Sequence, residues 1–208
     1  ARSSMSASGA EKAGSKRGRT KDTDKGKPVG KKRAGGTKAG GDNEPAVGCG
    51  PQWWLVKSEP DEYSIETLRD ASDRRGFWDG VRNFQARNLM LQMNVGDLAF
   101  FYHSSCKVPA IVGVCKVVET AKPDPTAFDP KHKYYDEKSD PDKPRWFGVT
   151  FEYVRTLKRQ LTLTELKTHK DGELSELTLL RVPRLSVQRV NPDCWQFLER
   201  LEQQRAPD

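Results

Sequence analysis

Apolar and polar positions alternate along several short stretches of the chain after residue 51, and these stretches are rich in β-branched and aromatic residues. This pattern is typical of β-strands. Residues 98–102 are instead apolar or aromatic at every position, which indicates a central strand buried on both faces. We therefore predict strands over residues 53–57, 98–103, 110–118, 146–155 and 185–190.

Capping residues mark the starts of helices between and after these strands. Ser64 is a suitable N-cap for a short helix over residues 65–70, and Asn191-Pro192 supplies an N-cap and first-position pair for a final helix. Two more helices are predicted over residues 84–93 and 163–168. Strands with short helices between and after them indicate an α+β fold built on a small curved or closed sheet.

A long loop is predicted over residues 122–145, which hold six basic residues, six acidic residues and five prolines. A loop of this length is either functional or mobile. Tyr134-Tyr135-Asp136 offers it an aromatic anchor.

Positive charge is concentrated at one end of the chain. The 208 residues carry a net charge of +7, and residues 1–50 alone hold 12 Lys+Arg and 5 Asp+Glu, which is also +7. The remaining residues therefore hold 24 basic and 24 acidic groups and are neutral. Residues 1–50 contain no Phe, Trp or Tyr, so we predict a disordered basic tail there and a folded domain over residues 51–205.

Two basic clusters lie in this tail, Lys16-Arg17-Gly18-Arg19 and Lys31-Lys32-Arg33. Such runs suit recognition by the nuclear import machinery or contact with phosphate, and the alternative is a solvated basic linker. We expect a nuclear protein with no membrane partner, since no apolar run is long enough to span a bilayer. The four cysteines fit no metal or redox spacing, so reduced thiols and no metal site are expected.

Motifs of several enzyme classes are missing from the sequence. It has no His-x-Glu with a closely spaced Cys pair, no Gly-x-Ser-x-Gly and no Gly-Lys-Ser/Thr, which argues against a zinc deaminase, an α/β-hydrolase and a P-loop protein. A nucleophile pair of Cys106 and His103 stays open as an alternative, but the two residues are three apart at a strand end and need not face each other.

A cluster of ring-binding groups extends from residue 78 to residue 105. Trp78 can stack on a nucleobase, Asp79 can accept from an exocyclic amine, and Asn83 can both donate and accept. Their structural alternatives are a core tryptophan, a turn aspartate and a helix cap. Hydroxyl, phenol and imidazole groups at strand ends can complete a pocket, or serve only the turns, at Ser58, Tyr102, His103 and Ser104.

Basic side chains beside this cluster have two possible roles. Arg82 and Arg87 either contact phosphate or form surface ion pairs. Lys57 would point to the strand face opposite Ser58 in a regular strand, so the two are not expected to line one pocket.

Several motifs together resemble the EVE domain, over about residues 53–203. They are Trp54-Leu55-Val56-Lys57-Ser58-Glu59-Pro60, Trp78-Asp79-Gly80-Val81-Arg82-Asn83 with Gln85-Ala86-Arg87-Asn88, Gly96-Asp97 through Phe100-Phe101-Tyr102-His103-Ser104, Pro109 to Gly113, Tyr135-Asp136 and Pro144-Arg145-Trp146. The resemblance implies a PUA-like fold related to YTH domains: a twisted, partly closed β-sheet flanked by helices.

The resemblance also implies a function. EVE domains are thought to read modified bases, so the chain is expected to bind a modified cytosine in DNA, such as 5-hydroxymethylcytosine, or a modified base in RNA. Lys57-Ser58 is similar to the first-strand end of YTH domains, Trp78 to a cage tryptophan beside Asp79, and Trp146 to a second cage wall. We expect a monomer without cofactor or catalysis. The alternatives are an enzyme that uses Asp79 or His103 as acid or base, and a protein–protein adaptor that uses the 122–145 loop.

Overall fold

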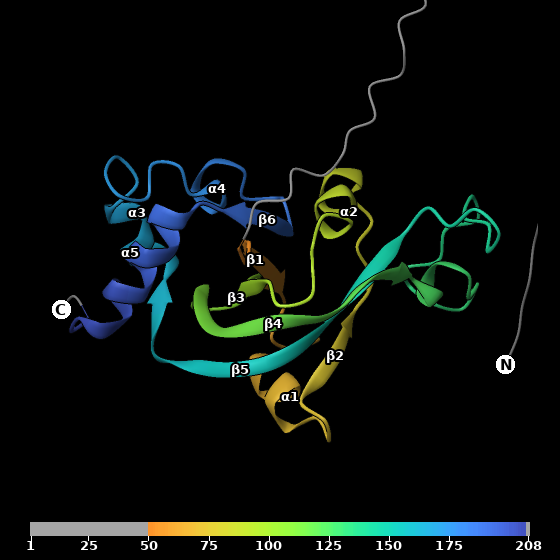
Figure 1. The fold of residues 1–208 in the computed structure, drawn as a ribbon, viewed down its shortest axis with the longest axis horizontal. Coiled ribbons are helices and arrows are strands. Elements are labelled where there is room, and N and C mark those ends of the chain that lie inside the picture. The colour runs from red at the N-terminus through yellow and green to blue at the C-terminus, as the bar shows by residue number, and fades with distance from the viewer. Residues whose placement is uncertain (1–49, 207–208) are drawn as a thin grey trace, which may run out of the picture. The chain divides into compact units, whose positions relative to one another are not determined.

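A six-stranded mixed sheet organises the part of the chain that the computed structural model describes, residues 50–206 (Figure 1). The strand order is β2-β5-β4-β3-β1-β6, in which only β1 and β3 pair in parallel. β2 and β6 are edge strands that do not pair with each other, so the sheet is not a closed barrel. The strands are β1 (Trp53–Ser58), β2 (Arg75–Trp78), β3 (Leu98–His103), β4 (Ala110–Pro123), β5 (Phe147–Thr162) and β6 (Val187–Val190).

Alternate residues of a strand point to opposite faces of the sheet, and helices cover both faces here. Trp54 and Phe101 belong to one buried cluster, which includes residues of α1 and α2. Leu55 and Phe100 belong to the other, which includes residues of α3, α4 and α5. The helices are α1 (Ile65–Asp70), α2 (Phe84–Met90), α3 (Leu163–Thr168), α4 (Thr178–Arg181) and α5 (Pro192–Gln203). The predicted α+β class is confirmed.

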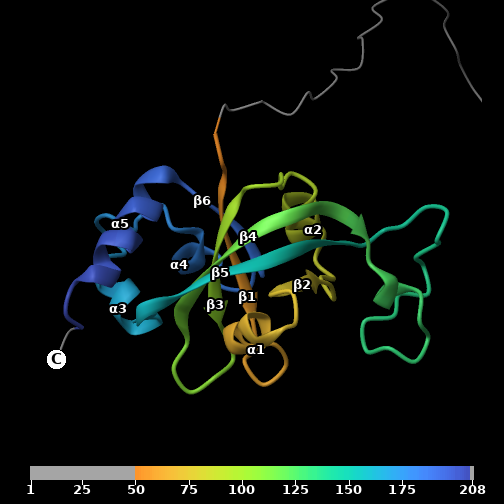
Figure 2. The ribbon, with the colours of Figure 1, turned by 60° about the horizontal axis from the view of Figure 1, so that its bottom comes forward.

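The long β4–β5 hairpin reaches from one end of the sheet to the other. Figures 1 and 2 both show α3 and α5 near one end of the hairpin and its connecting loop at the opposite end. The loop begins with a 3-10 turn over Pro125–Ala127. The hairpin therefore joins the region around the last helix to a projecting loop that connects β4 with β5.

Strand β3 lies between β1 and β4, and its residues 99–103 are buried, as predicted for a central strand. Asp97, just before it, is also buried and accepts hydrogen bonds from the Trp54 indole, at 2.9 Å, and from the main-chain N–H groups of Gln52 and Asn94. These hydrogen bonds hold the amino-terminal ends of β1 and β3 together. The carboxyl ends of the two strands are left available for other contacts.

Some elements differ from the prediction. β2 and α4 were not expected, and β4 and β5 extend beyond the predicted ends, because cross-strand pairing carries the hairpin past the apolar stretches. The helix predicted over residues 84–93 ends at Met90. The predicted disordered tail, with Lys31, Lys32 and Arg33, lies outside the described residues. Within residues 50–206, no helix is long and apolar enough to cross a membrane.

Candidate functional site

An open cleft of about 840 Å³ lies at the carboxyl ends of the parallel strands β1 and β3. Its walls also include the turn after β2, part of the β4–β5 loop and the segment between α4 and β6. This volume falls within the range of about 300–1,000 Å³ that is typical of small-molecule sites. The predicted site residues that line the cleft are Lys57, Ser58, Trp78, Asp79, Arg82, Tyr102 and Ser104.

The two serines close the ends of the parallel strand pair. Ser58 Oγ donates to the Tyr63 carbonyl at 2.6 Å, and Ser104 donates to the Ser58 carbonyl through both its N–H, at 2.8 Å, and its Oγ, at 3.2 Å. The Ser58 hydroxyl therefore serves its local turn, as the structural alternative predicted, whereas the Ser104 hydroxyl bonds across to the neighbouring strand; both residues still line the cleft. Each oxygen keeps lone pairs that can accept a hydrogen bond.

Lys57 lines the same cleft as Ser58, so the prediction that these two neighbours would not line one pocket is wrong. The cleft extends around the strand end, so side chains from both faces reach it. Lys57 Nζ donates to the Pro183 carbonyl and lies 5.7 Å from the centre of the Tyr102 ring. Burial lowers the pKa of the Lys57 ammonium. Burial also raises the pKa of the Tyr102 hydroxyl to about 12, and Cys106 adds a smaller effect in the same direction.

Trp78 contributes little of its ring to the cleft. The residue is only 8% exposed, and its indole makes edge contacts with three rings, the nearest being Phe101 at 5.3 Å between centroids. Phe151 and Tyr63 make the other two contacts. Because these rings surround it, Trp78 is mainly a core residue, and little of its surface is left for a ligand.

Asp79 is one of three acidic residues that line the cleft, together with Glu59 and Glu62. Partial burial, together with the negative charge of Asp124, raises the pKa of its carboxyl, and the charges of His132 and Arg82 oppose this shift. An ionised carboxylate accepts hydrogen bonds only, whereas a protonated one also donates. The Asp79 side chain can therefore pair with the edge of a polar ring, and its pairing depends on pH.

Three of the residues predicted to bind the base do not line the cleft. Asn83 caps α2, where its Oδ1 accepts from Ala86 N–H at 3.0 Å, so its structural alternative is the role that the structure shows. His103 is buried, and its Nε2 accepts from the Ile65 N–H at the start of α1. Trp146 donates from its indole to Asp136 at 2.6 Å and stacks on Phe84 with ring centroids 4.7 Å apart.

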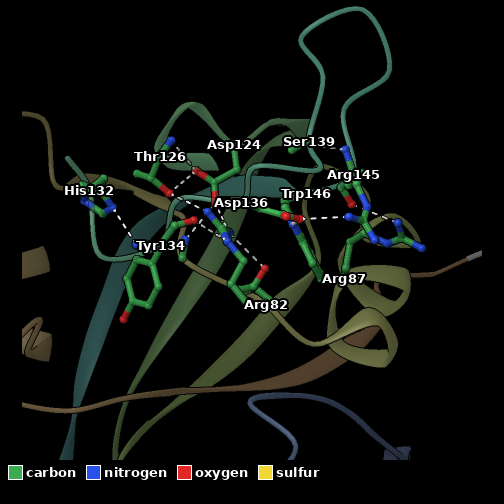
Figure 3. A network of polar contacts seen from close by, with 12 residues as sticks. Arg82, Arg87, Asp124, Thr126, His132, Tyr134, Asp136, Ser139, Arg145 and Trp146 are labelled. Carbon is green, nitrogen blue, oxygen red and sulfur yellow. Dashed lines mark hydrogen bonds and ion pairs between the residues drawn. The ribbon is translucent and has the colours of Figure 1, made fainter. Parts of the chain in front are cut away.

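Arg82 ties the β4–β5 loop to the turn after β2 (Figure 3). Its guanidinium donates to Asp124 at 2.7 Å, to the Tyr134 carbonyl at 2.7 Å and to the Thr126 hydroxyl at 3.0 Å. Burial would raise the pKa of the Asp124 carboxyl, but hydrogen bonds from Arg82, Thr126 and Gly80 outweigh burial and lower it. The Arg82 guanidinium thus orders a loop instead of projecting toward a phosphate.

Arg87 has a similar role farther along the loop (Figure 3). It donates to the Arg145 carbonyl at 2.9 Å and to the Asn88 side chain at 2.7 Å, and it lies 4.9 Å from the centre of the Phe84 ring. Arg87 does not line the cleft. Both arginines that were expected to contact phosphate are therefore held by the protein's own acceptors.

The tethered loop brings Tyr134 to the cleft. Tyr134 lines the cleft together with His132 and Lys133, and its ring lies 5.6 Å from the Arg82 guanidinium. Close packing on Gly80 fixes this position, since a Cβ at Gly80 would lie 2.5 Å from the nearest Tyr134 ring atom. The Tyr134-Tyr135-Asp136 motif indicated an anchor in this loop, but the sequence did not indicate that Tyr134 reaches the cleft.

Tyr63 and Arg184 are among the other lining residues that the sequence did not indicate. Tyr63 is half-buried between the cleft and Trp78, with ring centroids 6.2 Å apart. Arg184 is exposed on the segment that precedes β6. Neither residue has a local sequence signal. Tyr63 lies in the turn after β1, where its carbonyl accepts from Ser58 Oγ, and Arg184 reaches the cleft because β6 pairs with β1.

Comparison with known proteins identifies relatives whose sequences match most of this chain. Thymocyte nuclear protein 1 of Gallus gallus is 39% identical over 189 residues, which are 84% of this chain and 77% of the relative. The protein of the same name from Mus musculus is 42% identical over 166 residues, which are 73% of this chain and 74% of the relative.

Solved structures agree with these matches. A crystal structure of human THYN1 protein in complex with 5-methylcytosine containing DNA matches with a TM-score of 0.73 and 38% identity, over 74% of this chain and 99% of that one. A structure from Pseudomonas putida matches with a TM-score of 0.68 and 46% identity, over 72% of this chain and 99% of that one. The PUA-like α+β fold is confirmed. The EVE domain model matches residues 52–201, and the chain therefore belongs to the EVE domain family.

Proposed function

We propose that this protein reads nucleic acid by holding a modified base, extruded from its stack, in the cleft. A modified cytosine in DNA is the favoured ligand, and a modified base in RNA is the second. The observation that carries the proposal is a cleft with tyrosines and a carboxylate in a chain 38% identical to a human protein crystallised with 5-methylcytosine containing DNA.

The side chains of the cleft suit the two faces and the edge of a base. Tyr134 and Tyr63 supply ring surface, and stacking on an aromatic side chain contributes about 1–3 kcal/mol per base. Extrusion costs a few kcal/mol, so stacking alone about balances it and edge hydrogen bonds must add to affinity. Asp79 is the acceptor for an exocyclic amine such as N4 of cytosine.

The substituent on the base is read by the space and acceptors around it. A methyl group that fills a small void is worth about 1–3 kcal/mol. A hydroxymethyl group, as in 5-hydroxymethylcytosine, could also donate to a lone pair of Ser58 or Ser104. Tyr102 and Lys57 complete this side of the cleft, while Trp78 supports it from the core.

The basic residues 1–50 are proposed to serve both nucleic-acid binding and nuclear import. Residues 1–50, with Lys31, Lys32 and Arg33, supply the attraction to phosphate that the neutral remainder of the chain, residues 51–208, lacks, and they engage the nuclear import machinery. The names of the relatives support a nuclear location. The protein acts as a monomer without a cofactor.

Catalysis is not part of this proposal. Of the two acid–base candidates, His103 uses its Nε2 to accept from Ile65 and does not line the cleft, which leaves Asp79. Mass spectrometry of a 5-methylcytosine oligonucleotide after long incubation with the protein tests this point. We expect an unchanged mass, and a new product would establish the enzyme alternative.

The adaptor alternative is tested by deleting the 122–145 loop. Since His132, Lys133 and Tyr134 line the cleft, the deletion should remove oligonucleotide binding. Intact oligonucleotide binding with loss of a protein partner would favour the adaptor.

Fluorescence titration of matched oligonucleotides with 5-methylcytosine or cytosine tests the main proposal. The methylated oligonucleotide should bind more tightly, and Tyr134→Ala should weaken its binding by about 5- to 150-fold, the equivalent of about 1–3 kcal/mol. Tyr135→Ala is the matched control, because Tyr135 is 42% exposed and does not line the cleft. Equal affinity of the wild-type protein for both oligonucleotides would overturn the proposal.

A further inference from the structure

We propose that Arg184, on the turn between α4 and β6, contacts a backbone phosphate beside the base that occupies the cleft. This assignment rests on the function proposed above and adds the residue that holds the nucleic-acid backbone at the cleft. Arg82 and Arg87, which the sequence indicated for this role, are engaged inside the protein.

Arg184 differs from the other basic side chains that line the cleft. Lys57 donates to the Pro183 carbonyl, Arg82 is bound to Asp124 and the β4–β5 loop, and Lys133 is paired with Glu62. Within residues 50–206, Arg184 has no ion pair, side-chain hydrogen bond or ring contact, and it is exposed. An exposed guanidinium without an internal partner is free to form the bidentate contact that phosphate favours.

The turn that carries Arg184 is held in place on both sides. Leu185 N–H donates to the Val182 carbonyl at 3.2 Å, which closes the turn. Lys57 donates to this segment twice, from Nζ to the Pro183 carbonyl and from its main-chain N–H to the Ser186 carbonyl at 2.9 Å.

Gln188 secures the same turn from below. The residue is fully buried, and its Nε2 donates to the Leu185 carbonyl at 2.9 Å and to the Val182 carbonyl at 3.3 Å. A buried amide that donates to two carbonyls of one turn restricts the backbone there. Arg184 is therefore carried on a positioned segment, which limits the backbone ordering that a phosphate contact would require.

Charge distribution also favours a specific contact at this place. Residues 51–208 carry equal numbers of basic and acidic groups, so the domain as a whole provides no net attraction for DNA. Pro183, Arg184 and Ser186 line the cleft from the side that also holds Lys57. The phosphates on either side of an extruded base must pass its rim. A contact there positions the strand without reading its sequence.

The salt dependence of binding by Arg184→Gln tests the assignment in the full chain. Titrations of duplex DNA with 5-methylcytosine or cytosine would be run between 50 and 200 mM salt. Loss of one phosphate contact should reduce the slope of log K against log salt by about 0.9. Over this fourfold range the wild-type protein should then lose about 3.5-fold more affinity than the variant.

Arg181→Gln is the matched control, because Arg181 lies three residues earlier, is paired with Glu176 and does not line the cleft. Its slope should equal the wild-type slope. Arg184→Gln should weaken binding of both DNAs equally and leave their ratio unchanged. If Arg184→Gln has the same slope of log K against log salt as the wild-type protein, Arg184 does not contact a phosphate, even where the wild-type protein prefers methylated DNA. Absence of that preference in the wild-type protein would overturn the proposed function instead.

Discussion

Gly80→Ala is a small change that separates the position of Tyr134 from the rest of the cleft. Gly80 has a φ of +72°, and a Cβ there would lie 2.5, 2.7 and 3.0 Å from three atoms of the Tyr134 ring. Carbon atoms in contact are normally about 3.5–4.0 Å apart, so the ring must move by about 1 Å. The N–H of Gly80 can still donate to Asp124, because the substitution leaves it in place.

The expected effect on binding follows from this displacement. A gap of about 0.5–1 Å forfeits about a quarter to a half of a dispersion contact. Applied to a stacking contribution of about 1–3 kcal/mol, the loss is about 0.3–1.5 kcal/mol, or roughly 2- to 12-fold in Kd. An alanine with positive φ also lowers the free energy of unfolding by about 1–2 kcal/mol.

Gly96→Ala is the control for backbone strain. Gly96 has a φ of +97°, but no atom lies within 4 Å of the position of its added Cβ. Both variants should lose similar stability in urea titrations, whereas only Gly80→Ala should bind the methylated oligonucleotide less tightly. If the two variants bind alike after correction for the folded fraction, Tyr134 is not a wall of the base site.

The remaining predictions concern Trp78 and Asp79. Trp78→Ala removes a core ring, so it should lower the free energy of unfolding by about 3–5 kcal/mol in urea titrations and weaken binding of both oligonucleotides together. Normal stability with loss of discrimination between the two oligonucleotides would identify Trp78 as a stacking face instead. Because the pKa of Asp79 is raised, its ionised form is lost at a pH above the ordinary carboxyl pKa as the pH falls. The affinity for cytosine-type bases, measured by calorimetry, should fall at that pH, and Asp79→Asn should not show this step. The same raised pKa makes ionised Asp79 unfavourable for folding at neutral pH, so Asp79→Asn should melt higher at pH 7, and its advantage should vanish below the ordinary carboxyl pKa.

Elements with local signals were predictable from the sequence. Ser64 accepts from Thr67 N–H and Asn191 accepts from Cys194 N–H, and the helices begin where these caps predicted. β2 was not predictable, because Arg75 and Gly76 carry no β signal and the strand exists through its pairing with β5.

The cleft was predictable only in part, for a similar reason. Ser58, Asp79 and Ser104 stand at strand ends and turns, where a local pattern places them near an opening. Tyr134 reaches the cleft because Arg82 binds a loop about 42–52 residues farther along the chain. No short-range pattern reveals where a guanidinium will find its acceptors.

The β4–β5 loop is fastened near both of its ends. Asp124 is bound by Arg82 and Gly80 at the first end, and Trp146 is bound to Asp136 and stacked on Phe84 at the second. Substitutions at residues 132 and 133, between these attachments, can change the cleft wall without disturbing either hydrophobic cluster of the sheet. As in the variable loops of antibodies, recognition and fold stability depend on different residues. Under the proposed function, chains with this fold can therefore diverge in the bases they accept while keeping the same frame.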